Sequence, residues 1–167
     1  MRGAERGWCA DGGTGRALGL ATLAALAAII LAIAGCRGLR VKEGIYANLT
    51  EARAAGAIAN GWVPDGLPAS AGDLREGHMP DGSHWGVFTF APSDGPIVRA
   101  LLRSEITSDT PACHPPGRLE WLPELLHSPI DLARVRATAF RLYLGADGTT
   151  YSVNWNDGRA YYWRETQ

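Results

Sequence analysis

The sequence has too few cysteines to build its fold around disulfide bonds. Only three occur in 167 residues: Cys9 precedes a long apolar run, Cys36 closes that run, and Cys113 lies far downstream. If Cys36 is modified on its sulfur, Cys113 has no partner for an intramolecular bridge, even in an oxidising compartment. We therefore expect the folded part of the chain to be stabilised by side-chain packing.

The sequence also lacks an excess of charge of either sign. The segment from Cys36 to Gln167 contains 13 Arg and Lys and 15 Asp and Glu residues, which gives a net charge of −2. Without a long-range positive field there is nothing to attract a polyanion. The composition therefore predicts no nucleic-acid partner.

A recognisable catalytic motif is missing as well. Ser70 lies in a proline-rich stretch but lacks the flanking glycines of a nucleophile elbow. Cys113 and His114 are adjacent, and because neighbouring side chains rarely point at one another, we do not expect an activated thiol. We predict no catalytic residue, no resident metal and no cofactor, and hence no enzyme.

What the sequence does contain is a long apolar segment near its start. Nineteen residues from Ala17 to Gly35 carry no charge, and Arg2, Arg6 and Arg16 precede them. A basic beginning followed by an apolar run is typical of a secretion signal. We therefore expect this segment to direct the chain to a membrane.

The apolar segment ends in Ile33-Ala34-Gly35-Cys36. An aliphatic residue and two small residues before a cysteine resemble the lipobox of bacterial lipoproteins. The resemblance implies that residues 1–35 are a cleaved signal peptide, that Cys36 is lipidated, and that residues 36–42 form a tether. Each buried methylene contributes about 0.8 kcal/mol, so several acyl chains anchor a protein durably. The protein would then lie in the bacterial cell envelope, facing the periplasm or the exterior.

An uncleaved transmembrane helix is the alternative interpretation of the same segment. At about 1.5 Å per residue, its nineteen residues come close to the roughly 30 Å thickness of the hydrocarbon core. Charge does not settle the orientation, because Arg37, Arg40 and Lys42 follow the run closely. The cysteine at the end of the run favours the lipoprotein.

Helix signals are spread over the first part of residues 43–167. Thr50, before an alanine-rich run, predicts the N-cap of a helix within residues 46–59. Ser70 and Asp73 approximate a capping box and predict a short helical turn that ends near His78. Further short helical pieces are predicted within residues 96–103 and 119–135.

Strand signals are clearest toward the C-terminus. Aromatic and β-branched residues predict a strand at 85–91. Alternating side chains predict a meander over residues 139–164, with turns at 145–148 and 156–158. Residues 43–167 are therefore expected to form a single α+β domain, with short N-terminal helices packed on an antiparallel sheet of about four strands that ends in the C-terminal meander.

Four polar residues, Glu76, His78, Asp81 and His84, lie close together in the sequence. Carboxylates and imidazoles bind zinc and other divalent ions, so Glu76, His78 and His84 define one alternative function, a metal-binding or hydrolytic protein. Their spacing matches no established ligand signature. We expect instead a solvated polar turn, with Glu76 and His78 at the surface.

Four aromatic residues near the C-terminus, Trp155, Tyr161, Tyr162 and Trp163, define a second alternative. Aromatic faces stack on sugar rings, which suggests binding of glycans or peptidoglycan. Alternating aromatics must also supply the core of a sheet, so about half of the four are expected to be structural. Exposure of Tyr162 together with a neighbour would favour the binding role.

A longer pattern in the segment 61–85 reads Gly-Trp, then Pro-x-x-Leu-Pro-x-Ser-Ala, an aliphatic residue, Glu-x-His and a later Trp. Its positions are Gly61, Trp62, Pro64, Leu67, Pro68, Ser70, Ala71, Leu74, Glu76, His78 and Trp85. The pattern resembles a motif of small, uncharacterised bacterial membrane proteins and lipoproteins. The resemblance implies no activity. We interpret the segment as a rigid corner in which Trp62 and Leu67 fill the core and Ser70 caps the next turn, or as a surface that presents Glu76 and His78 to a partner.

The sequence thus predicts a membrane-anchored envelope lipoprotein with a non-enzymatic interaction or structural module. Its expected partners are the membrane, through the lipid anchor or a transmembrane helix, and an envelope protein or peptidoglycan.

Overall fold

A computed structural model describes residues 41–107, 121–126 and 130–165. The chain divides into two units, Met1–Arg40 and Val41–Gln167, and every described residue belongs to the second. The predicted signal peptide, Cys36, Cys113 and His114 lie outside the described residues. In the part of the chain that is described, no helix is both long enough and apolar enough to cross a membrane.

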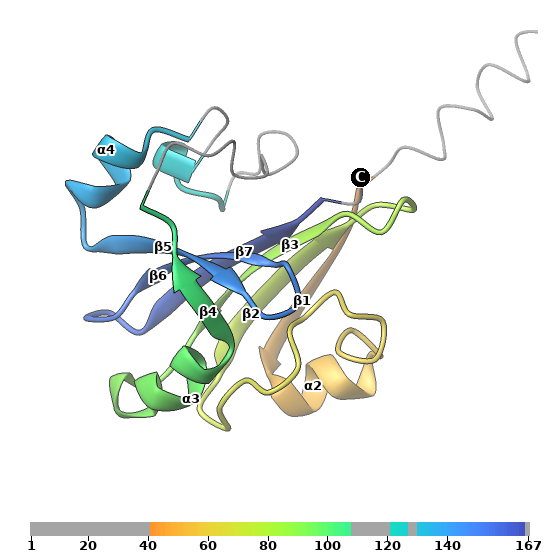
Figure 1. Cartoon of the computed structure of the whole chain (residues 1–167). Coiled ribbons are helices and arrows are strands. Elements are labelled where there is room, and N and C mark those ends of the chain that lie inside the picture. Colours follow the sequence, from red (N-terminus) through yellow and green to blue (C-terminus); the bar gives the residue numbers. More distant parts are fainter. Residues whose placement is uncertain (1–40, 108–120, 127–129, 166–167) are drawn as a thin grey trace, which may run out of the picture. The chain divides into compact units, whose positions relative to one another are not determined.

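A seven-stranded antiparallel sheet is the centre of the second unit (Figure 1). The strand order is β1-β2-β3-β7-β6-β5-β4, which leaves β1 and β4 at the two edges. The strands are β1 (Lys42–Asn48), β2 (Gly72–His78), β3 (His84–Thr89), β4 (Leu102–Glu105), β5 (Phe140–Gly145), β6 (Thr150–Asn154) and β7 (Arg159–Arg164).

The described helices are short. They are α2 (Leu49–Ala54), α3 (Gly95–Ala100) and α4 (Leu132–Arg136), with 3-10 turns η2 (Pro92–Asp94) and η3 (Glu124–Leu126). Helices α2 and α3 lie on one side of the sheet and α4 lies on the other (Figure 1).

The prediction of N-terminal helices on a sheet of about four strands is therefore wrong, because the sheet has seven strands and dominates the fold. Strand β1 includes Lys42, which was predicted to end the tether, and residues 46–48, which were predicted to begin a helix. The helix begins only at Leu49, and its N-cap is Asn48, whose side chain accepts from the Glu51 N–H at 3.1 Å, rather than Thr50.

Strand β2 replaces the helical turn predicted after Ser70. The Ser70 hydroxyl does not cap a helix, because it accepts from the Ala91 N–H at 3.1 Å and donates to Asp94 Oδ2 at 2.5 Å. Asp73 has a φ of +46° where the register between β2 and β3 shifts, which is the geometry of a β-bulge. The two residues of the capping-box pattern therefore have other roles. Ser70 binds the segment after β3, and Asp73 lies at the bulge of β2.

Two predictions for the C-terminal half hold, and one holds in part. The strand predicted at 85–91 is β3, and the meander is confirmed, since β5 pairs with β6 and β6 pairs with β7. The helix predicted at 96–103 ends at Ala100, and strand β4 begins at Leu102.

Both faces of the sheet carry a hydrophobic core. The first face is covered by α2, the loop after it and α3, and its buried residues include Ala52, Leu74, Phe88, Val98 and Tyr162. The second face is covered by residues from η3 and α4, and its core includes Trp85, Leu126, Val135, Tyr161 and Trp163. Because successive residues of a strand point to opposite faces, the central strands β3 and β7 contribute to both cores.

One cross-strand row on the first face combines glycines with large polar residues. Gly44, Glu76, Gly86, Tyr162 and Tyr151 are direct partners across β1, β2, β3, β7 and β6. A Cβ at Gly86 would collide with the hydroxyl end of Tyr162 and with the Arg75 carbonyl oxygen. The glycine therefore makes room for the tyrosine within the sheet.

We expect Gly86→Ala to destabilise the domain by about 1–3 kcal/mol, because the added methyl overpacks a buried contact with backbone on one side. Gly95→Ala is the matched control. The Cβ it adds lies 3.8 Å from the nearest atom, in Trp155, so a change within about 0.5 kcal/mol is expected. Urea denaturation followed by circular dichroism measures both. Equal stability of the two variants would contradict the close packing of Tyr162 against Gly86.

Candidate functional site

A buried Glu76–His78 pair lies on the first face of strand β2. The two residues are two positions apart, so both side chains point to the same face. His78 Nδ1 lies 2.9 Å from Glu76 Oε2, and the residues are 8% and 1% exposed. A carboxylate at this depth is stable only if its oxygens have partners.

Three aromatic residues complete the surroundings of the pair. The Tyr46 hydroxyl donates to Glu76 Oε1 at 3.2 Å, so both carboxylate oxygens are engaged. The Trp62 indole stacks on the His78 imidazole, with ring centroids 3.6 Å apart and planes 6° from parallel. The Tyr162 hydroxyl donates to the Trp62 carbonyl oxygen at 2.8 Å and so fixes the backbone of the stacking residue.

Burial and the charge of Glu76 perturb the neighbouring phenols. Burial raises the pKa of Tyr162 well above its usual value, and the negative charge of Glu76 raises it further. Burial, and then the charge and hydrogen bond of Glu76, also raise the pKa of Tyr46. Both hydroxyls therefore remain protonated at neutral pH and can serve as hydrogen-bond donors.

The prediction that Glu76 and His78 are solvated at the surface is wrong. They lie in a strand instead of a turn, and the register places a glycine on each side of Glu76, at Gly44 and Gly86. A side chain at Gly44 would meet both the Tyr46 hydroxyl and the Glu76 carboxylate. Because Gly44 and Gly86 have no side chains, they leave the space that the Glu76 carboxylate and its partners occupy.

His84 lies on the same face but does not complete a metal site. It is the direct cross-strand partner of His78 and is 8% exposed. Its Nδ1 lies 3.0 Å from the Gly82 carbonyl oxygen, while Asp81, in the exposed turn, accepts from the Ser83 N–H. Among the described residues, no group of three or more His, Cys, Asp and Glu side chains could hold a metal ion. Glu76, His78 and His84 are therefore not gathered around one point in the described part of the chain.

The C-terminal aromatics do not form a platform. Tyr161, Tyr162 and Trp163 are 5%, 1% and 0% exposed, because β7 is a central strand with a core on each face. Trp155 is half-buried; its Nε1 donates to the Tyr143 hydroxyl at 3.0 Å, and Arg99 lies 4.3 Å from its ring centroid. We expected about half of these four aromatic residues to be structural, but at least three of them are buried core residues.

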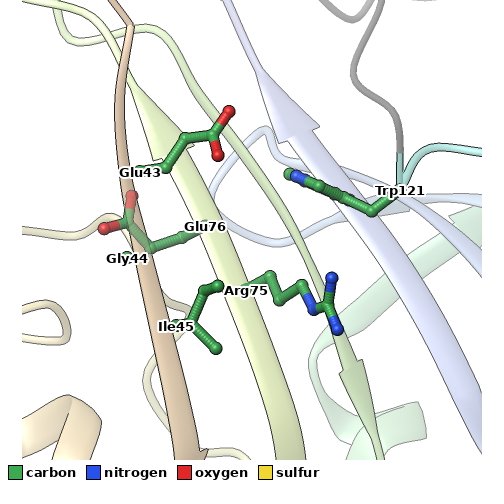
Figure 2. A pocket seen from close by; sticks show the side chains of 6 residues that line it. All are labelled: Glu43, Gly44, Ile45, Arg75, Glu76 and Trp121. Carbon is green, nitrogen blue, oxygen red and sulfur yellow. The ribbon is translucent and has the colours of Figure 1, made fainter.

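An open pocket lies on the second face, at the edge of the sheet formed by β1 and β2 (Figure 2). It has a volume of about 400 Å³ and is lined by Glu43, Gly44, Ile45, Arg75, Glu76 and Trp121. In Figure 2, the side chains of Glu43, Arg75 and Trp121 extend toward the opening, whereas the Glu76 carboxylate points away from it. Ligand pockets range over roughly 300–1,000 Å³, so this one is large enough for a small molecule.

Sequence reasoning missed every residue of this pocket whose side chain faces the opening. Ile45 and Arg75 are direct partners across β1 and β2, but neither strand was predicted. Trp121 comes from a stretch between prolines that showed only weak helix signals. The one available signal was the alternation of Glu43 and Ile45 with Gly44 and Tyr46, which is consistent with a strand.

Comparison with known proteins gives one match. Residues 41–90 match the family model described as the YbbD head domain, which is a bacterial family. The matched stretch spans β1, α2, β2 and β3, and so includes the Glu76–His78 pair and the strand residues of the pocket. It covers less than half of the chain. No curated protein and no solved structure matches.

We expect His78→Ala to lower the free energy of unfolding by about 2–4 kcal/mol, because Glu76 would stay buried without one of its two partners. The substitution also removes the stacking of Trp62. Glu43→Ala, on the exposed part of β1, is the control and is expected to change stability by no more than about 0.5 kcal/mol. Urea denaturation at pH 7 measures both. If His78→Ala behaves like the control, the pair does not stabilise the fold.

Alkaline pH should destabilise the domain through its buried tyrosines. Between the pKa of the unfolded chain and the higher pKa of the folded state, only the folded state keeps the phenolic proton. Stability is therefore fully present below about pH 10 and falls above it, by up to about 1.4 kcal/mol per pH unit for each such group. Tyr162→Phe should lower stability at pH 7, because the Trp62 carbonyl loses its donor, and should make the alkaline slope shallower. Identical slopes for both proteins above pH 10 would contradict the assignment to Tyr162.

Proposed function

We propose that this protein is a lipoprotein of the bacterial cell envelope, acylated at Cys36, whose folded domain is a non-enzymatic interaction module. The observation that carries the proposal is the position of Cys36, directly after Ile33-Ala34-Gly35 at the end of an uncharged run. The match of residues 41–90 to a bacterial family supports the bacterial setting. The acyl chains would hold the domain at a membrane surface, where a partner in the envelope is within reach.

The geometry around His78 supports a non-enzymatic role. An imidazole that acts as a general base needs a nitrogen within hydrogen-bond reach of a substrate. Here His78 is only 8% exposed and one face of its ring is covered by Trp62 at 3.6 Å, so little of the imidazole is accessible to a substrate. The pair that most resembles a catalytic dyad is thus built into the core and serves to join β2 to the loop after α2.

Metabolic labelling with a palmitate analogue tests the anchor. The wild-type chain should take up label and migrate without residues 1–35, whereas Cys36→Ala should stay unlabelled and uncleaved, because the acylated sulfur is missing. Cys113→Ala is the matched control and should be labelled and processed like the wild type. A wild-type protein that is unlabelled and full length would contradict the proposal and would instead indicate a transmembrane anchor.

A further inference from the structure

The pocket at the β1–β2 edge combines opposite charges with apolar surface. Glu43 supplies a carboxylate and Arg75 a guanidinium, so the formal charges of the lining side chains that face the opening cancel. Ile45, the cross-strand partner of Arg75, is 70% exposed, more than any other large apolar side chain among the described residues. An isoleucine this exposed, in a pocket that an indole also lines, forms apolar surface that a ligand can cover.

Arg75 lies near one carboxylate, that of Asp73. Its Nε lies 3.8 Å from Asp73 Oδ1, and Asp73 also lies 3.7 Å from Arg159 Nη2. Because the contact with Asp73 is made through Nε, the terminal Nη groups remain for a ligand. Figure 2 shows these groups directed toward the side of the opening where Trp121 lies.

Trp121 supplies both a flat apolar surface and a donor. In Figure 2, the nitrogen-bearing end of its indole is turned toward Glu43. An indole ring offers its face for stacking and its N–H for one hydrogen bond. Around one opening the chain therefore places an acceptor, several donors, an aromatic face and an aliphatic side chain.

We propose that this pocket binds a saccharide unit that carries an acetamido group. The hydroxyls and the amide of such a sugar both donate and accept, which matches Glu43 and Arg75 without requiring net charge on the ligand. The apolar face of the ring would stack on Trp121, and the acetamido methyl would cover Ile45. The site is distinct from the C-terminal aromatics, and the inference does not depend on the lipid anchor.

Titration calorimetry of the full chain in a detergent without sugar tests the proposal. The probe is the β-1,4-linked trimer of N-acetylglucosamine, and cellotriose, which has the same linkage but no acetamido groups, is the matched ligand. We expect saturable binding of the first and at least about fivefold weaker binding of the second. Absence of saturable binding, or equal binding of the two trimers, would overturn the proposal.

Variants locate the site. Arg75→Ala, Glu43→Ala and Trp121→Ala should each weaken binding about fivefold or more, because each removes a polar or stacking partner. Trp121 packs against the second-face core, so Trp121→Phe, which keeps an aromatic face, provides a variant that is expected to fold and to bind with intermediate affinity. Arg159→Ala is the matched control: it contacts the same Asp73 and is equally exposed, at 44% against 42%, but does not line the pocket. Wild-type affinity in Arg75→Ala, or an equal loss in Arg159→Ala, would show that the pocket is not the site.

Discussion

The fold has to accommodate one buried carboxylate, that of Glu76, on the first face of its sheet. Glu76 is 1% exposed in a strand that pairs on both sides, so solvent cannot stabilise its charge. Its oxygens are satisfied by Tyr46 from β1 and by His78 from its own strand. Room for these groups comes from Gly44 and Gly86, its direct cross-strand neighbours. The stack of Trp62 on His78 and the bond from Tyr162 to Trp62 then tie the loop after α2 and the strand β7 to the same point. Four segments, β1, the loop after α2, β2 and β7, thus meet at one polar centre.

Burial on both faces explains why the residue types that suggest chemistry are mostly structural here. The middle of a central strand with a core on each side is buried, so Tyr161, Tyr162 and Trp163 are all removed from solvent. At the edge, where β1 has one neighbour, Glu43 and Ile45 of the second face remain open to solvent. The pocket beside Trp121 forms there, and the same edge carries the exposed Ile45. The pocket therefore lies where the sheet ends, and the two cores lie where the sheet is covered.

Sequence reasoning succeeded where the pattern is local. In the meander, short turns join strands whose apolar residues alternate, so Leu142, Tyr151 and Val153 indicate their strands without knowledge of any partner. It failed at β2, where Leu74 is followed on the same face by Glu76 and His78. Polar residues at core positions break the apolar alternation, and Ser70 with Asp73 imitates a helix cap. The proximity of Glu76 and His78 is evident from the sequence, but their burial was not predicted, because it depends on Trp62 and Tyr46 from other segments.

By itself the sequence determined the uncharged N-terminal run with its cysteine, the small number of cysteines, and the C-terminal meander. Each of these follows from neighbouring residues, since the hydropathy of a run, the count of cysteines and a two-residue alternation need no long-range information. The tertiary structure alone decided that Glu76 and His78 are buried partners, that the C-terminal aromatics are core residues, and that Glu43, Arg75 and Trp121 surround one pocket. These facts depend on strand register and on the packing of segments far apart in the chain, because a shift by one residue would turn every side chain of a strand to its other face.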